Sequence, residues 1–203
     1  SWYWKLYKWP ILTRLWYLTT ISIPSSVKYI GKKAFYNCES LKEIIIPPLI
    51  TKIEANTFES CKSLTKIALP NSIVSIGEYA FASCISLKEI SIPSSVTIIG
   101  RDAFHDCKSL EYINIPPELM IIETSLFYNC SSLKQIVIPP LVIEIGSHSF
   151  ENCISLKKVI FQDATSRSLT NSFNHLFSKF LPNYASVLHL NKFQFLQCIE
   201  ILK

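Results

Sequence analysis

The sequence predicts a solenoid, in which short coils of chain stack in register, and three observations support this prediction. Cysteine recurs every 23 residues, from Cys38 to Cys153. Phenylalanine recurs at the same interval from Phe35 to Phe150, and proline does so from Pro24 to Pro139. A period of roughly 20–50 residues is typical of stacked repeats, because one unit cannot bury its apolar face without a neighbour.

The composition excludes several other classes of protein. Apolar residues make up 49% of the 203 residues and charged residues 17%, which excludes intrinsic disorder. No apolar run reaches the roughly 18 residues of a membrane-spanning helix, so no membrane span is predicted. The net charge of +5 is too small and too scattered to indicate a nucleic-acid-binding protein.

Residues 1–22 precede the regular repeats and are expected to form a degenerate, aromatic N-terminal cap. They contain all four tryptophans, and Trp4 and Tyr7 fall in register with apolar positions of the later units. A solenoid needs an atypical end unit, since one face of that unit has no neighbour. The alternative is an aromatic patch for a membrane surface or a partner. The segment does not resemble a signal peptide, because it has no apolar stretch followed by a small-residue cleavage site.

Six regular units follow over residues 23–160, and each is expected to repeat one local structure. The unit 92–114 reads IPSSVTIIGRDAFHDCKSLEYIN, with apolar residues at unit positions 1, 5, 8, 12, 13, 16, 19 and 22. Positions 22 and 1 have strand spacing, and positions 12, 13 and 16 would share one face of a helical turn. Each unit therefore predicts a short strand, a turn, a second extended stretch and a short helical turn. Strands of neighbouring units are expected to lie parallel, ~4.8 Å apart.

Residues 161–203 are expected to hold a degenerate repeat followed by a C-terminal cap. Phe161 and Phe173 keep the register of positions 1 and 13, and Leu176 replaces the cysteine. The period is then lost, as expected of a terminal unit whose outer face has no neighbour.

The unit pattern IPxxVxxIGxxAFxxCxSLxxI resembles the leucine-rich repeat of the BspA-like group, over roughly residues 12–176. Glu54 and Glu123 replace the glycine at position 9, which argues against a strict requirement for positive φ there. The resemblance implies a curved leucine-rich-repeat solenoid with a protein-binding role. It also implies a cell-surface or secreted protein, because members of the group are often adhesion-associated surface proteins. The alternative is an intracellular structural scaffold within a larger protein assembly.

No pattern in the sequence indicates catalysis, a cofactor or a metal site. Equivalent cysteines of stacked coils would have Cβ atoms ~4.8 Å apart, wider than a disulfide allows, and no Cys-x-x-Cys pair indicates zinc. The cysteines are therefore expected to be reduced and buried. His105 and His148 occupy variable unit positions without a serine or cysteine at a catalytic spacing, and no glycine-rich phosphate loop is present. The sequence thus predicts a protein that is not an enzyme.

Two candidate surfaces for a protein partner follow from the predicted coil. The first is the outward face of the main strand, at unit positions 20, 21 and 23, where lysines outnumber glutamates. A solvated face without a partner is the alternative, since charged residues on a sheet surface need no partner. The candidate residues of this face are Lys42, Lys66, Lys88, Tyr112, Lys134 and Lys157.

The second candidate surface flanks the second extended stretch, at unit positions 4, 6 and 7. Its residues are polar in the first units and become apolar toward the C-terminus. Large exposed apolar patches usually mark interaction sites, so a partner or the chain's own residues 177–203 are expected to cover this surface. We call its six residues the apolar flank: Val74, Ile98, Met120, Ile121, Leu141 and Ile143.

Overall fold

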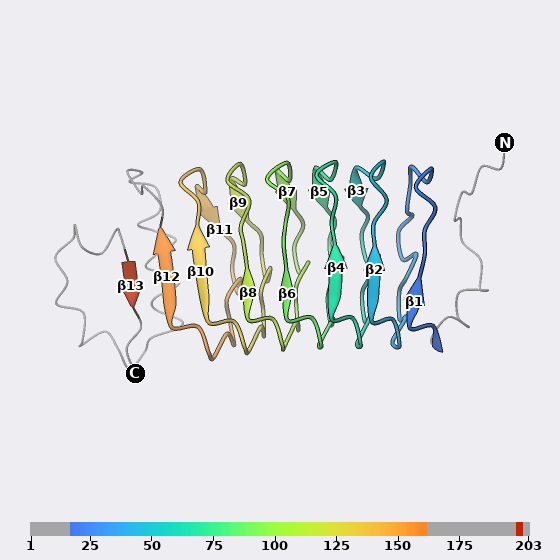
Figure 1. The fold of residues 1–203 in the computed structure, drawn as a ribbon. Coiled ribbons are helices and arrows are strands. Elements are labelled where there is room, and N and C mark those ends of the chain that lie inside the picture. The colour runs from blue at the N-terminus through green and yellow to red at the C-terminus, as the bar shows by residue number, and fades with distance from the viewer. Residues whose placement is uncertain (1–16, 162–197, 201–203) are drawn as a thin grey trace.

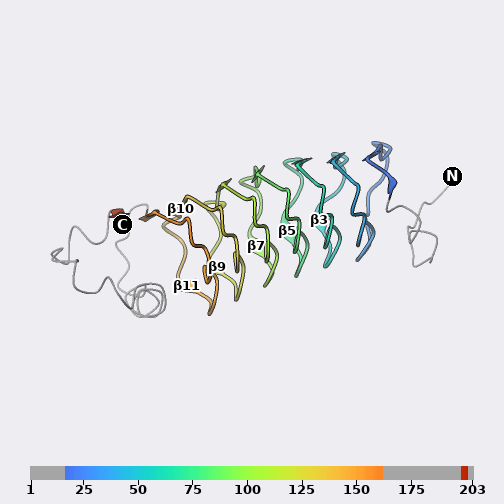
Figure 2. The same ribbon diagram turned by 90° about the horizontal axis from the view of Figure 1, so that it is seen from below.

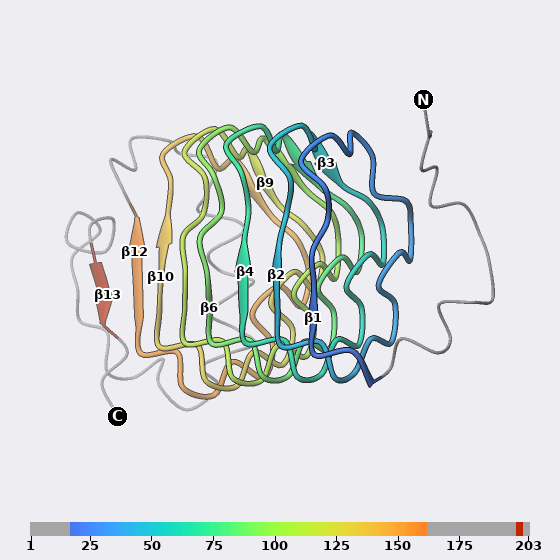
Figure 3. The same ribbon diagram turned by 45° about the vertical axis from the view of Figure 1, so that its right-hand side comes forward.

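The computed structural model describes residues 17–161 and 198–200, which form a solenoid of coils stacked along one axis (Figure 1). Each regular coil from residue 46 onward passes through two rows of short strands, which Figure 3 shows on different sides of the coil. The first strand row contains β1 (Thr20–Ile21), β2 (Glu43–Ile45), β4 (Lys66–Ala68), β6 (Glu89–Ile90), β8 (Tyr112–Ile113), β10 (Gln135–Ile138) and β12 (Lys158–Phe161). The second contains β3 (Lys52–Ile53), β5 (Ser75–Ile76), β7 (Ile98–Ile99), β9 (Ile121–Ile122) and β11 (Glu144–Ile145).

Paired strands of successive coils run parallel with a register of one repeat, and the pairing is interrupted between β4 and β6, between β7 and β9, and between β8 and β10. Ile44 of β2 lies opposite Ile67 of β4, and Ile76 of β5 lies opposite Ile99 of β7. Figure 2 shows the strands of the second row following one another in chain order. The exception is β13 (Cys198–Glu200), which pairs antiparallel with β12 at the end of the first row. The predicted solenoid of parallel-stranded repeats is confirmed, whereas the predicted caps fall largely outside the described residues and stay predictions.

The segment expected to form a helical turn is instead a run of overlapping β-turns. The backbone N–H groups of Ala34, Tyr36 and Cys38 donate to carbonyls three residues earlier, at 3.1–3.2 Å. The residues at unit positions 11 and 15 have φ between 53° and 62°, which interrupts a right-handed helix. Position 15 is always Asn, Asp or Ser, and Asn and Asp tolerate the left-handed conformation well. These residues are Asn37, Ser60, Ser83, Asp106, Asn129 and Asn152.

The same turns join each coil to the next through a third set of hydrogen bonds. The N–H groups of Lys33, Phe35 and Asn37 donate to carbonyls of the following coil at 3.2, 2.9 and 2.9 Å. The pattern recurs in later coils, for example from Phe58 to the Ala80 carbonyl at 2.8 Å. Backbone groups of the turn are therefore paired between coils even though no helix pairs them locally.

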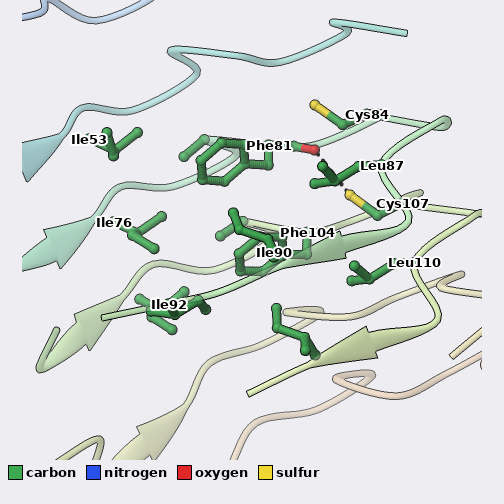
Figure 4. Packing of buried hydrophobic residues seen from close by; sticks show 14 of the residues in the cluster. Ile53, Ile76, Phe81, Cys84, Leu87, Ile90, Ile92, Phe104, Cys107 and Leu110 are labelled. Carbon is green, nitrogen blue, oxygen red and sulfur yellow. Dashed lines mark hydrogen bonds between the residues drawn. The ribbon is translucent and has the colours of Figure 1, made fainter. Parts of the chain in front are cut away.

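A column of phenylalanine rings forms the centre of the core (Figure 4). Neighbouring rings from Phe35 to Phe150 are stacked, with centroids 5.2–5.8 Å apart. Phe58, Phe81, Phe104 and Phe127 are fully buried. This column is surrounded by the inward isoleucines of both strand rows and by the leucines at unit position 19. Each inner coil therefore shares its apolar surface with two neighbours.

Glycine at unit position 9 controls how closely the coils approach in the second strand row. A Cβ on Gly100 would lie 2.6 Å from the backbone nitrogen of Glu78 in the preceding coil, and one on Gly77 would lie 2.6 Å from that of Ala55. Gly77, Gly100 and Gly146 all donate their N–H to the preceding coil at 2.7–2.8 Å. None of these glycines has positive φ, which agrees with the expectation from the two glutamates.

Where position 9 is glutamate, the strand row is interrupted among the described residues. Glu123 follows β9, which pairs with β11 but not with β7. Glu54 follows β3, which pairs with β5 and with no strand of the coil 23–45. Because a side chain at this position meets the backbone of the preceding coil, we attribute both interruptions to the glutamate Cβ.

Candidate functional site

A groove of about 830 Å³ lies on the outer face of the first strand row, across β4, β6, β8 and β10. Strand alternation positions its walls, since the inward residue Ile90 or Ile113 of each strand is buried while its neighbours face outward. The side chains at unit position 21 lie along the groove: Lys66, Glu89, Tyr112 and Gln135. Those at position 23 form a second line: Ala68, Ser91, Asn114 and Val137.

Asn114 lines the groove, and its side chain bonds to the backbone of the same coil. Its Nδ2 donates to the Ile92 carbonyl at 2.7 Å, and its Oδ1 accepts from the Ile92 N–H at 2.8 Å. Two coils earlier, the equivalent bond of Ile46 goes directly to the Ala68 carbonyl at 3.3 Å. The Asn114 side chain therefore substitutes for a backbone hydrogen bond at this position.

The rim of the groove carries positive charge that is only partly compensated. Lys134 is ion-paired with Glu111, and its ammonium lies 5.5 Å from the centroid of the Tyr112 ring. The hydrogen bond from Lys134 lowers the pKa of the Glu111 carboxyl, and Lys88 lowers it further. The predicted residues Lys42, Lys66, Lys88 and Lys157 are exposed, and the described residues give them no ion-pair partner. Of the predicted lysine-rich face, Lys66 and Tyr112 line the groove.

The six residues of the apolar flank are all solvent-exposed and lie beside the second strand row. Their exposed fractions run from 37% for Ile121 to 62% for Ile98. Hydrogen bonds align them between coils, since the Ile143 N–H donates to the Met120 carbonyl at 2.9 Å. Residues 177–203, the expected intramolecular cover, lie outside the described residues except for β13, which pairs in the first strand row.

The histidine at position 105 lies in a cluster of charged and aromatic side chains. Its Nδ1 is 3.1 Å from an Asp102 carboxylate oxygen, its Nε2 is 3.1 Å from one of Asp106, and its ring stacks on Tyr128 at 4.8 Å. Cys107, the nearest thiol in sequence, is fully buried and donates to the Phe81 carbonyl at 3.2 Å. The cluster therefore brings no nucleophile to the imidazole and joins the turns of adjacent coils.

The cysteine series lines the core as a column of thiols, with no disulfide among Cys38 to Cys153. From Cys61 onward each Sγ donates to the carbonyl of the phenylalanine 26 residues earlier, at 3.1–3.2 Å. Burial raises the pKa of these thiols, to about 12 in Cys153. The described residues hold no group of three or more His, Cys, Asp and Glu side chains suited to a metal.

This arrangement makes the thiols unreactive in the folded protein. At about pH 8, where an exposed cysteine is partly ionised, we expect the thiols of Cys61 to Cys153 to resist an alkylating reagent and to react fully in denaturant. Site-resolved mass spectrometry measures the modification. Cys107→Ala should cost about 1 kcal/mol, because it removes one thiol hydrogen bond and little volume. Rapid alkylation of Cys84 or Cys107 in the native state would contradict a buried column.

A search of family models and solved structures places this architecture among known proteins. The model of the BspA type leucine rich repeat region matches with six copies, over residues 13–134, 51–179 and 120–202. No match is found among curated proteins. Within the described residues, no helix has the length and apolar character to cross a membrane.

Three solved structures are similar to this chain. A leucine-rich repeat protein from Bacteroides ovatus is 41% identical with a TM-score of 0.68, and the match covers 71% of this chain but 37% of that one. The T. pallidum leucine-rich repeat protein is 32% identical (TM-score 0.64), covering 75% of this chain and 69% of that one. A leucine rich cell surface protein from Faecalibacterium prausnitzii is 26% identical (TM-score 0.57), covering 73% and 48%. Its repeat, its coil geometry and these matches together show that the chain belongs to the BspA-type leucine-rich-repeat family.

Proposed function

We propose that this chain is a non-enzymatic protein-binding module of a cell-surface or secreted protein, and that its partner occupies the groove of the first strand row. The groove itself is the observation that supports this assignment. It combines an apolar lining at Ala68, Leu69 and Val137, a half-exposed aromatic side chain in Tyr112, and the positive charge of Lys66. Protein interfaces are enriched in tyrosine near their centre and are polar at the rim.

The excess of positive charge indicates the chemistry of the partner. The outward residues of the first strand row include six lysines, Lys42 to Lys158, and three glutamates, Glu43, Glu89 and Glu111. A partner segment with acidic side chains would be attracted to this face, and its association would slow as salt increases. The surface location is supported by one relative, which is described as a leucine rich cell surface protein.

A photo-crosslinking experiment tests the groove. A crosslinking amino acid at Ser91 captures the partner from native material, and the same amino acid at Ile154, far from the groove, is the control. The captured protein is then purified and titrated with wild-type protein and with Tyr112→Ala. We expect Tyr112→Ala to raise Kd about tenfold, because a central tyrosine is commonly a binding hot spot.

The matched control is Tyr36→Ala, which removes an equally exposed tyrosine from a turn outside the groove. It should leave Kd unchanged. Equal affinities for Tyr112→Ala, Tyr36→Ala and wild type would overturn the groove assignment. Labelling of intact source cells with an impermeant reagent tests the location, since the intracellular scaffold alternative predicts labelling only after lysis.

A further inference from the structure

We infer that the apolar flank binds a second copy of this chain, with the two stacks running in opposite directions. The inference does not depend on the groove, which lies on the other strand row. It starts from the residues at unit position 7 of five successive coils. Strand pairing aligns the first three of these residues with one another and the last two with each other. In chain order they are Lys52, Ser75, Ile98, Ile121 and Glu144.

This row has a positive end, a middle of one serine and two isoleucines, and a negative end. Ile98, at its centre, is 62% exposed, and Ile121 beside it is 37% exposed. Lys52 and Glu144 are both exposed, and neither has an ion-pair partner among the described residues. They lie four coils apart, about 19 Å at the usual strand spacing, so they cannot pair within one chain.

Such a row is complementary to itself once it is reversed. A two-fold axis through Ile98, parallel to the strands, exchanges the coil 46–68 with the coil 138–160. Lys52 of each copy then lies opposite Glu144 of the other, and Ile98 lies opposite its own equivalent. Closed homodimers commonly use one self-complementary patch in this way.

At two neighbouring unit positions, pairs of apolar side chains would also meet across this axis. At position 6, Val74 would face Met120, and at position 4, Leu49 would face Leu141. All four side chains are between 42% and 52% exposed in the single chain, so each has apolar surface to bury. Two such contacts form on each side of the axis, which extends the apolar contact from Ile98 toward both charged ends.

The charges also exclude the other face-to-face orientation. If the two stacks ran in the same direction, Lys52 would meet its own equivalent and Glu144 would meet its own. Like charges placed together across an interface are unfavourable, whereas the reversed arrangement converts both contacts into attractive pairs. The row therefore selects a second copy in the reversed orientation over a parallel pair.

A charge-swap experiment with the full chain tests this inference. Sedimentation equilibrium is expected to give a dimer for the wild type. Lys52→Glu and Glu144→Lys should each raise the dimer Kd about tenfold at low salt, because each places two like-charged pairs across the axis. An equimolar mixture of these two variants should recover wild-type affinity, since every carboxylate then meets an ammonium. A chain carrying both substitutions should recover it too.

Ile98→Asp tests the apolar centre, where the two copies would bring two carboxylates together. We expect it to raise the dimer Kd more than tenfold, while Ile154→Asp, a change at a 76% exposed isoleucine outside the flank, leaves Kd unchanged. Thermal unfolding of both variants at a concentration where the wild type is monomeric checks that each stays folded. A wild-type monomer at every concentration, as expected if residues 177–203 or another protein covered the flank, would overturn the inference. A dimer unaffected by Ile98→Asp, or a mixture of charge variants without recovery, would overturn it as well.

Discussion

Phe104→Ala is expected to lower the free energy of unfolding by ~3–5 kcal/mol, the largest effect among the single substitutions considered. The Phe104 ring is fully buried and stacks on two others, at 5.4 Å from Phe81 and 5.8 Å from Phe127. Its removal leaves a cavity in the core and removes the ring contacts to both the preceding and the following coil. Denaturant unfolding followed by circular dichroism measures the loss, provided the transition stays two-state.

The comparison that makes this prediction specific is Phe150→Ala. Phe150 is 2% exposed, and the described residues give it one stacked ring, Phe127 at 5.4 Å. Its loss removes fewer ring contacts and lies at the last regular coil, where the neighbouring chain can relax into the space. We therefore expect a smaller loss than at Phe104. Small and equal losses at both positions would contradict a core held together by the stacked rings.

The repeat predicted the core correctly because packing leaves little freedom at inward positions. Each residue at an inward position contacts its equivalents in the coils on both sides, so the same side-chain size suits every coil. This is why the period identified Ile99, Phe104 and Cys107 as core residues, and all three are at most 1% exposed. The same reasoning predicted reduced, buried cysteines, but the thiol hydrogen bonds to phenylalanine carbonyls needed coordinates.

The expected helical turn could not be distinguished from β-turns by apolar spacing alone. Both conformations place Ala103, Phe104 and Cys107 on the core side of the coil. A signal was present at unit position 15, where Asn, Asp and Ser alternate without any bulky residue. At position 11 no such signal exists, because Tyr79 and His148 adopt positive φ there as well. The hydrogen bond from the Tyr79 N–H to the Arg101 carbonyl of the next coil, at 3.1 Å, helps to hold Tyr79 in a conformation that its side chain disfavours.

The candidate surfaces were predictable in part. Strand alternation was enough to place Lys66 and Tyr112 on an outward face. The apolar flank was identified because its residues flank the inward positions of the second extended stretch, and they are exposed in the single chain. The groove was not predicted, because strand alternation identifies outward residues without showing which side chains turn back to the backbone, as Asn114 does at Ile92. The small residues at position 23, Ala68 and Ser91, were the available indication that this face could be hollow.

Gly100→Ala is expected to destabilise the protein by ~1–3 kcal/mol, although alanine usually stabilises a residue with ordinary φ. The added methyl group would meet backbone atoms of Gly77 and Glu78 at 2.6–3.0 Å, and backbone cannot rotate away as a side chain can. The coils must therefore separate, which breaks the hydrogen bond from the Gly100 N–H to the Ile76 carbonyl at 2.8 Å. Amide hydrogen exchange should accelerate at Gly100 and at its ladder neighbours in β7.

Glu123→Ala is the matched control. It places the same residue at the same unit position, but in a coil whose second-row strand is not paired with the preceding coil. There the second strand row is interrupted between β7 and β9, and a Cβ is present in the native protein. Its stability should change by less than about 0.5 kcal/mol, as expected for a substitution without a close backbone contact. If Gly100→Ala were as harmless as Glu123→Ala, close coil approach would not be the reason for glycine at position 9. If Gly100→Ala lowers the free energy of unfolding and Glu123→Ala does not, then a side chain at position 9 is compatible only with an interrupted strand ladder. The two glutamates would then explain the two interruptions.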